Sequence, residues 1–238
     1  MHVRKLNHRQ QAGSPHAPRM DKGNLREMDR RSGGNKTWLL LAAIFVAGLG
    51  GSPAWACRLA VLGDSLAAGY GVTEEDAFPV RLETALRQDG VDCTVINAGV
   101  SGDTSAGGAA RLDWVLGDQP THLLVELGGN DALRGLPVDQ LRSNLDQIIT
   151  TAQARGVQVM LAGMLAPPNL GRDYGEAFKQ VYTDLARRHQ VSFYPFFLDG
   201  AIMQSALMQP DGIHPNAEGV EVIVQRIAPA VAAFVEDE

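Results

Sequence analysis

The stretch Val61-Leu62-Gly63-Asp64-Ser65-Leu66 is where the fold and the function of this chain are decided. Residues 59–62 form a short apolar run that predicts a buried strand, and Gly-Asp-Ser ends that run abruptly. A parallel α/β sheet binds its ligands at the carboxyl ends of its strands, so Ser65 stands where a nucleophile would act. The tripeptide by itself favours an ordinary strand-to-helix turn, in which Asp or Ser caps the helix. A catalytic role for Ser65 therefore has to be argued from the rest of the chain.

Apolar strands alternate with amphipathic helices from this point to the carboxyl end. The alternation predicts an α/β fold, with a parallel sheet covered by helices on both faces. Short apolar runs predict strands over residues 59–62, 94–98, 122–127, 157–161 and 191–194. Apolar residues at helical spacing predict helices over residues 78–88, 105–116, 138–155, 174–189 and 216–235. The longer loops, over residues 72–76, 166–173 and 199–212, are expected to carry function.

The first 56 residues differ from the rest. They hold nine basic and three acidic residues, an apolar run from Trp38 to Leu49, and an Ala-Trp-Ala sequence that ends at Ala56. This order predicts a secretory signal peptide cut after Ala56, with a domain over residues 57–238 exported to the periplasm. The basic region is long for a signal, and a start at Met20 or Met28 would suit it better. The alternative is a membrane anchor over residues 37–57, which carry no charge.

Charge and cysteine content narrow the class of function. Removal of the 56-residue prefix leaves 12 basic and 24 acidic residues, a net charge of −12. Such a surface repels phosphate backbones, which argues against nucleic-acid binding. Cys57 and Cys93 both lie near the starts of predicted strands. An oxidising compartment favours a disulfide between them, and two free thiols are the alternative. No Cys-x-x-Cys pair or histidine cluster indicates a metal site.

A serine nucleophile needs a base, and usually a carboxylate that orients the base. Three of the six histidines fall in the prefix. His122 opens a predicted strand at the end away from the ligand crevice, and His189 ends a helix next to Arg187 and Arg188. His214, in the sequence Asp-Gly-Ile-His-Pro, is the best candidate by elimination, with Asp211 as its orienting group. The alternative for that loop is a simple Asp-Gly turn in which Pro215 starts the last helix.

Acyl transfer also needs hydrogen-bond donors aimed at the developing oxyanion. Gly102 follows the second predicted strand, and glycine lets its N–H approach a ligand closely. The alternative there is a loop in which Asp103 or Thr104 caps the next helix. Asn130 follows the third strand, between glycines and Asp131, and offers side-chain N–H groups. A glycine-rich turn is its alternative, since the lysine and hydroxyl residues of a phosphate-binding loop are absent.

In this combination the sequence resembles the SGNH (GDSL) hydrolase family. Its four blocks are matched in order by Gly63-Asp64-Ser65-Leu66, Gly102, Asn130 and Asp211-Gly212-Ile213-His214. Longer runs over residues 96–105, 125–135 and 211–215 resemble one subgroup, the bacterial secreted arylesterases and acyl-CoA thioesterase I/lysophospholipases.

This resemblance implies a three-layer, flavodoxin-like α/β/α fold around a five-stranded parallel sheet. It implies Ser65 as nucleophile, His214 as base and Asp211 as its orienter. It also implies an oxyanion hole formed by the N–H groups of Ser65 and Gly102 and by the Asn130 side chain. A mobile loop over residues 131–136, beside an acyl channel, is implied as well, and no metal or cofactor.

The expected function is that of a serine hydrolase acting on small-molecule esters and thioesters of single acyl chains, with no obligatory protein partner. A carbohydrate-ester deacetylase on the same fold is a second candidate, although the chain has few aromatics for stacking on sugars. A non-catalytic flavodoxin-like binding domain is a third. Asp64 is expected to shape the turn that holds Ser65, and Asp211 fits the role of triad acid better.

Overall fold

The computed structural model describes residues 56–237. The predicted signal peptide, its alternative start sites and almost all of the alternative anchor over residues 37–57 lie outside these residues. Within the described part, no helix has both the length and the apolar character needed to cross a membrane.

Five strands form one sheet in which every pair is parallel. They are β1 (Cys57–Gly63), β2 (Cys93–Gly99), β3 (His122–Glu126), β4 (Gln158–Ala162) and β5 (Ser192–Tyr194). Their order across the sheet is β2-β1-β3-β4-β5, the doubly wound order of flavodoxin-like folds. The predicted fold class is therefore confirmed. The order also places β1, which leads to Ser65, between the strands that lead to Gly102 and Asn130.

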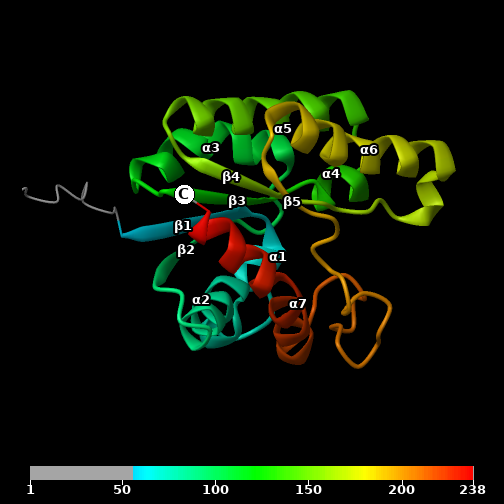
Figure 1. Ribbon diagram of the computed structural model, residues 1–238. Coiled ribbons are helices and arrows are strands. Elements are labelled where there is room, and N and C mark those ends of the chain that lie inside the picture. The colour runs from blue at the N-terminus through cyan, green and yellow to red at the C-terminus, as the bar shows by residue number, and fades with distance from the viewer. Residues whose placement is uncertain (1–55, 238) are drawn as a thin grey trace, which may run out of the picture. The chain divides into compact units, whose positions relative to one another are not determined.

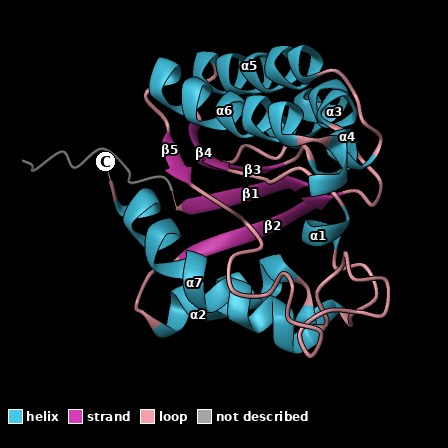
Figure 2. Cartoon of the chain, turned by 90° about the vertical axis from the view of Figure 1, so that its right-hand side faces the viewer, coloured by secondary structure: helices cyan, strands magenta, loops and turns pink. Residues whose placement is uncertain are grey.

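Helices cover both faces of the sheet (Figures 1 and 2). The helices are α1 (Ser65–Ala68), α2 (Phe78–Gln88), α3 (Ser105–Gly117), α4 (Gly129–Leu133), α5 (Val138–Ala154), α6 (Arg172–His189) and α7 (Ala217–Glu236), with 3-10 turns at Glu74–Asp76 and Pro168–Leu170. One face carries α2 and α7, and the other carries α3, α5 and α6. Each of the five longer helices lies within two residues of its predicted range.

The central strands are buried on both sides, which explains their sequence. Leu59, Ala60, Val61 and Leu62 have no solvent exposure. A strand covered on both faces has no polar side, so β1 reads as an unbroken apolar run. The strand β3 is equally buried but ends in an acid, Glu126, whose side chain has no exposure either. An acidic residue at such a position is unusual, and the Glu126 side chain accepts the N–H of Asp64 in the turn after β1.

At the amino ends of the strands, the side chains make structural contacts. Cys57 and Cys93 are paired in register on β1 and β2 and form a disulfide. His122 begins β3 at the same end, where its ring packs edge-on against Phe234. His122 therefore lies at the opposite end of the sheet from Ser65, as its place in the sequence predicts.

Candidate active site

The turn that carries the candidate nucleophile Ser65, here called the nucleophile turn, begins at Gly63, where the neighbouring atoms leave no room for a side chain. A Cβ atom on Gly63 would lie 2.5 Å from the Cβ of Ala67 and 2.5 Å from Oε2 of Glu126, so only glycine fits. Asp64 then caps the short helix α1, because its Oδ1 accepts the N–H of Leu66 at 3.0 Å. Ser65 is the first residue of α1, and its N–H is one of the donors that a helix leaves without an internal partner.

A second segment brings the base to Ser65. Nε2 of His214 lies 2.9 Å from Oγ of Ser65, and Nδ1 of the same ring lies 2.7 Å from Oδ2 of Asp211. The other oxygen, Oδ1 of Asp211, accepts the N–H of Ile213 at 2.9 Å and that of His214 at 3.0 Å. The hydrogen bond from His214, followed by these two N–H groups, lowers the pKa of Asp211 to about 2. A permanent carboxylate at Nδ1 holds the proton there and leaves Nε2 free to accept the serine proton.

The loop that carries His214 is tied to the nucleophile turn by Gln209. Its backbone N–H donates to the carbonyl of His214 at 2.8 Å. Its side-chain Nε2 donates to the carbonyls of Tyr70, at 2.8 Å, and Pro215, at 2.9 Å. The ring of Tyr70, which is half exposed, lies over the imidazole of His214 with 4.5 Å between ring centroids. The segments that carry Ser65 and His214 are thus held together by contacts other than those among Ser65, His214 and Asp211.

Two loops beside Ser65 present N–H donors. Gly102 has a φ of +84°, a conformation that favours glycine, and no group in residues 56–237 accepts its N–H. Asn130, in the first turn of α4, donates from Nδ2 to Oδ2 of Asp64 at 3.0 Å. An amide nitrogen carries two protons, so this bond orients the group and leaves a second N–H for a ligand. The three predicted oxyanion donors therefore follow the carboxyl ends of three neighbouring strands, β1, β2 and β3.

Two arginine side chains form hydrogen bonds that fix the positions of these loops. Arg111 of α3 donates from Nε to Asp103 at 2.6 Å and from Nη2 to the carbonyl of Gly63 at 2.9 Å. It therefore joins the segment next to Gly102 to the residue that starts the nucleophile turn. Arg134, which follows α4, donates to the carbonyl of Gly102 at 2.7 Å.

The segment after Asn130 differs from the implied loop. Residues 131–133 complete the helix α4, and Asp131 is buried. The two carboxylate oxygens of Asp131 accept the N–H of Ser105 at 2.8 Å and its hydroxyl at 2.5 Å. A loop was expected over residues 131–136, and this half of it is instead a helical turn fixed to the start of α3.

Two carboxyl groups are buried under the site. Burial, opposed by hydrogen bonds from Leu66 and Asn130, raises the pKa of Asp64 to about 6. Burial, with the neighbouring Asp64 as a second cause, raises the pKa of Glu126 well above its usual range. Oε2 of Glu126 accepts the N–H of Asp64 at 3.2 Å, and this hydrogen bond helps to fix the backbone of the turn. Sequence reasoning missed Glu126, although an acid at the end of a fully apolar strand was the available signal.

The remaining candidates lie away from Ser65. His189 at the end of α6 bonds through Nε2 to Oδ1 of Asp146 on α5, at 2.7 Å. Within residues 56–237, no group of three or more His, Cys, Asp or Glu side chains is arranged to hold a metal ion.

Known proteins are similar to this chain in sequence and in fold. The pattern of the GDSL-like Lipase/Acylhydrolase family matches residues 61–222. Esterase TesA of Pseudomonas aeruginosa is 39% identical over 194 residues, covering 81% of this chain and 96% of its own. Thioesterase 1/protease 1/lysophospholipase L1 of Escherichia coli K12 is 39% identical over 181 residues, covering 76% and 86%. The crystal structure of a psychrotrophic esterase, EstA from Pseudoalteromonas sp., inhibited by monoethylphosphonate, superposes with a TM-score of 0.72 at 32% identity, covering 76% of this chain and 99% of EstA. The chain belongs to the GDSL-like lipase/acylhydrolase family.

Proposed function

We propose that this protein is a serine hydrolase that cleaves carboxylic esters and thioesters of single acyl chains. The observation that carries the proposal is the continuous hydrogen-bonded series from Ser65 through His214 to Asp211, beside unused N–H donors. Family membership supports ester hydrolysis as the reaction class. A non-catalytic binding domain would have no need of this series.

In the proposed reaction, Oγ of Ser65 attacks the acyl carbonyl carbon while Nε2 of His214 takes its proton. The imidazolium is stabilised by the carboxylate of Asp211, which stays charged because its pKa is about 2. His214 then gives the proton to the departing alcohol or thiol. Water, activated by the same nitrogen, attacks the acyl-enzyme and releases the carboxylic acid.

The oxyanion of each tetrahedral intermediate is assigned to the N–H groups of Ser65 and Gly102 and to the second N–H of Asn130. Donors of this kind stabilise the transition state because they are already oriented before charge develops. The contacts of Arg111, Arg134 and Asp64 support that orientation, since each fixes a backbone or amide group next to a donor.

We also propose that the enzyme acts outside the cytoplasm, in the periplasm, as a domain that begins at Cys57. The signal-like order of the first 56 residues supports export. The disulfide between Cys57 and Cys93 suits an oxidising compartment.

The test is hydrolysis of 4-nitrophenyl butyrate by the purified domain and by its Ser65→Ala variant. We expect the variant to lose activity by about 10⁶-fold, as for nucleophile removal in other serine hydrolases. A fluorophosphonate probe should label Ser65 in the wild-type protein, and peptide mapping should locate the adduct. Undiminished hydrolysis by Ser65→Ala, or labelling of another residue, would reject the assignment. Acetylated xylan serves as the comparison substrate for the deacetylase alternative.

A further inference from the structure

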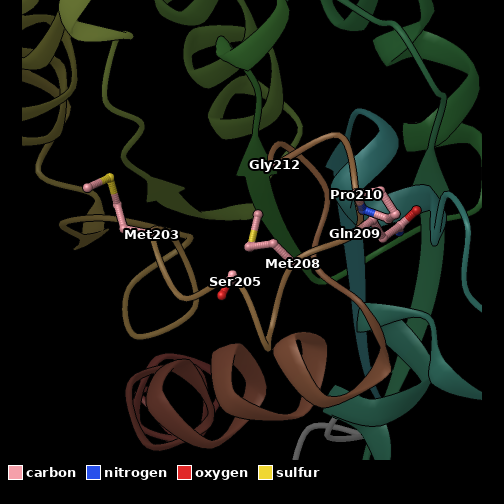
Figure 3. Close-up of a pocket in the computed structure, with 6 residues that line it drawn as sticks. All are labelled: Met203, Ser205, Met208, Gln209, Pro210 and Gly212. Carbon is pink, nitrogen blue, oxygen red and sulfur yellow. The ribbon is translucent and has the colours of Figure 1, made fainter.

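A pocket in the loop between β5 and α7 and the buried side chain of Glu126 both lie outside the proposed reaction. The pocket has a volume of about 460 Å³ and is lined by Met203, Ser205, Met208, Gln209, Pro210 and Gly212 (Figure 3). None of these residues belongs to the triad or carries a proposed oxyanion donor, so the lining gives the pocket no place in the reaction. Glu126, in contrast, is hydrogen-bonded to the residue next to Ser65.

The register of the sheet places Glu126 between two parts of the proposed oxyanion hole. Glu126 is the last residue of β3 and pairs with Gly63, the last residue of β1. From this pair, β1 leads directly to Ser65, and β3 leads to Asn130 in the first turn of α4. A side chain at this point can therefore fix the position of one segment relative to the other.

The carboxyl group of Glu126 makes that connection. Its Oε2 accepts the N–H of Asp64 at 3.2 Å. A Cβ atom on residue 63 would lie 2.5 Å from the same oxygen, so the glycine there makes room for the carboxyl group. Asp64 in turn accepts the N–H of Leu66 and the Nδ2–H of Asn130, both at 3.0 Å. A series of hydrogen bonds thus runs from Glu126 through Asp64 to Asn130.

The burial of an acid at this point is unfavourable for stability. The side chain of Glu126 has no solvent exposure, and its Oε1 has no hydrogen-bond partner within residues 56–237. An apolar residue in the same place would bury no unpaired oxygen, so the acid calls for an explanation other than packing. Burial and the neighbouring Asp64 raise the pKa of Glu126, which favours its uncharged form. An uncharged carboxyl group still accepts a hydrogen bond, and it places no negative charge beside a developing oxyanion.

We propose that Glu126 is a positioning residue for the oxyanion hole: its carboxyl oxygen fixes the backbone of Asp64, and through it the N–H of Ser65 and the amide of Asn130. This proposal rests on the proposed function, because it assigns Glu126 to the same reaction. Glu126 acts through these groups and does not touch the substrate. The role requires an acceptor oxygen at this place and no negative charge.

The kinetic test compares two replacements of similar size. Glu126→Gln keeps an acceptor oxygen, and Glu126→Met removes it. We expect Glu126→Met to lower kcat for 4-nitrophenyl butyrate by about tenfold with little change in KM, because misplaced oxyanion donors weaken the transition state above all. Glu126→Gln should retain most of the wild-type kcat. The matched control is Glu83→Met, since Oε2 of Glu83 accepts the N–H of Val95 on β2 at 2.7 Å; it should lower stability and leave kcat unchanged.

A double variant separates positioning from a general loss of structure. The factor by which Glu126→Met lowers kcat should be smaller in the Asn130→Ala protein than in the wild type, because one of the donors that Glu126 positions is already absent. The proposal is overturned by an equal factor in the two proteins. It is also overturned by full kcat in Glu126→Met, or by a loss of kcat in Glu126→Gln as large as that in Glu126→Met.

A measurement without turnover keeps this proposal separate from the proposed function. Amide hydrogen exchange of Asp64 and Leu66 is followed by NMR in the Ser65→Ala protein, with the amide of Val61 in β1 as the internal reference. Adding Glu126→Met should speed exchange of the Asp64 N–H by about tenfold relative to Val61, whereas adding Glu126→Gln should leave it slow. This contrast supports the positioning role even if the wild-type protein hydrolyses no ester, a result that would reject the proposed function alone.

Equally slow exchange of the Asp64 N–H in both variants contradicts the positioning role. If Glu126→Met does not fold, Glu126→Gln decides. Slow exchange together with retained kcat in that variant supports an acceptor role, and fast exchange or a large loss of kcat rejects it.

Discussion

The two aspartates of the candidate site, Asp64 and Asp211, occupy opposite environments. Asp64 is buried in a turn between a strand and a helix, and burial raises its pKa to about 6. Asp211 lies on an exposed loop, and hydrogen bonds from His214 and two backbone N–H groups lower its pKa to about 2. The same side chain is thus pushed toward its neutral form in one region and toward its charged form in the other.

This difference suggests that the two aspartates have separate roles, one in positioning neighbouring groups and one in supplying negative charge. A triad carboxylate must remain ionised to stabilise the imidazolium, and a solvated loop with three donors makes that inexpensive. The nucleophile turn must instead be rigid, and the hydrogen bonds that Leu66 and Asn130 donate to the carboxyl group of Asp64 supply that rigidity. Asp64 therefore holds donors in place, whereas Asp211 supplies charge.

The largest expected effect is on the exposed side. Asp211→Asn should lower kcat for 4-nitrophenyl butyrate by about 10⁴-fold, because an amide at this position no longer fixes the proton on Nδ1 of His214. The retained side-chain oxygen can still accept the N–H groups of Ile213 and His214. The variant loses the stabilisation that comes with the lowered pKa of Asp211, so we expect a modest loss of stability, far smaller than the loss of activity. Steady-state kinetics and urea unfolding of the same preparation test both statements.

If the Asp211→Asn protein lost activity only because a large fraction of it was unfolded, this division of roles would be contradicted. Asp199→Asn, which alters a carboxylate paired with Arg226 elsewhere on the surface, is the matched control and should change neither quantity substantially.

A smaller effect on kcat is expected for Asn130, the residue that donates a hydrogen bond to Asp64. Asn130→Ala removes the proposed oxyanion donor, whose amide is hydrogen-bonded to Asp64, and should lower kcat by about 10²–10³-fold with a smaller change in KM. Asn169→Ala, in the exposed turn before α6, is the control for loss of an asparagine side chain. If Asn130→Ala raised KM and left kcat unchanged, Asn130 would stabilise the bound substrate and the transition state equally, and its assignment to the oxyanion would fail.

Most of the fold could be predicted from the sequence, because long elements repeat their pattern. The range predicted for α2, residues 78–88, is the observed one, and the apolar run 59–62 lies inside β1. The short helices α1 and α4 were not predicted, since four or five residues cannot display a helical period. The 131–136 segment was accordingly expected to be a loop, although the contact of Asp131 with Ser105 holds its first half in a helix.

The residues of the site divide in the same way. Ser65, Asp211 and His214 belong to local motifs, so spacing along the chain brings them to attention. Arg111 and Gln209 act through contacts with residues that lie 48 and 139 positions away in the sequence. No local sequence pattern around Arg111 or Gln209 indicates these partners. Long-range positioning of this kind depends on the tertiary fold.

The last expected effect concerns the buried aspartate and is read from stability. An unfolded Asp titrates near pH 3.8, whereas Asp64 in the folded protein titrates at about pH 6. Between these values the folded state holds a proton that the unfolded state has released. The stabilisation is therefore complete below pH 3.8 and is lost as the pH rises through 6, by about 3 kcal/mol in all.

Asp64→Asn cannot titrate, so the wild-type protein should lose about 3 kcal/mol relative to this variant between pH 3.5 and pH 7. Urea unfolding at a series of pH values measures that difference. Because the charge of Asp64 also raises the pKa of Glu126, the same series on Glu126→Gln and on the double variant separates the two groups. The lowered pKa of Asp211 gives the opposite sign, since its contribution grows as the pH rises from about 2 to 4. A difference between wild type and Asp64→Asn that stayed constant with pH would mean that Asp64 ionises like an exposed residue, and the contrast between the two aspartates would fail.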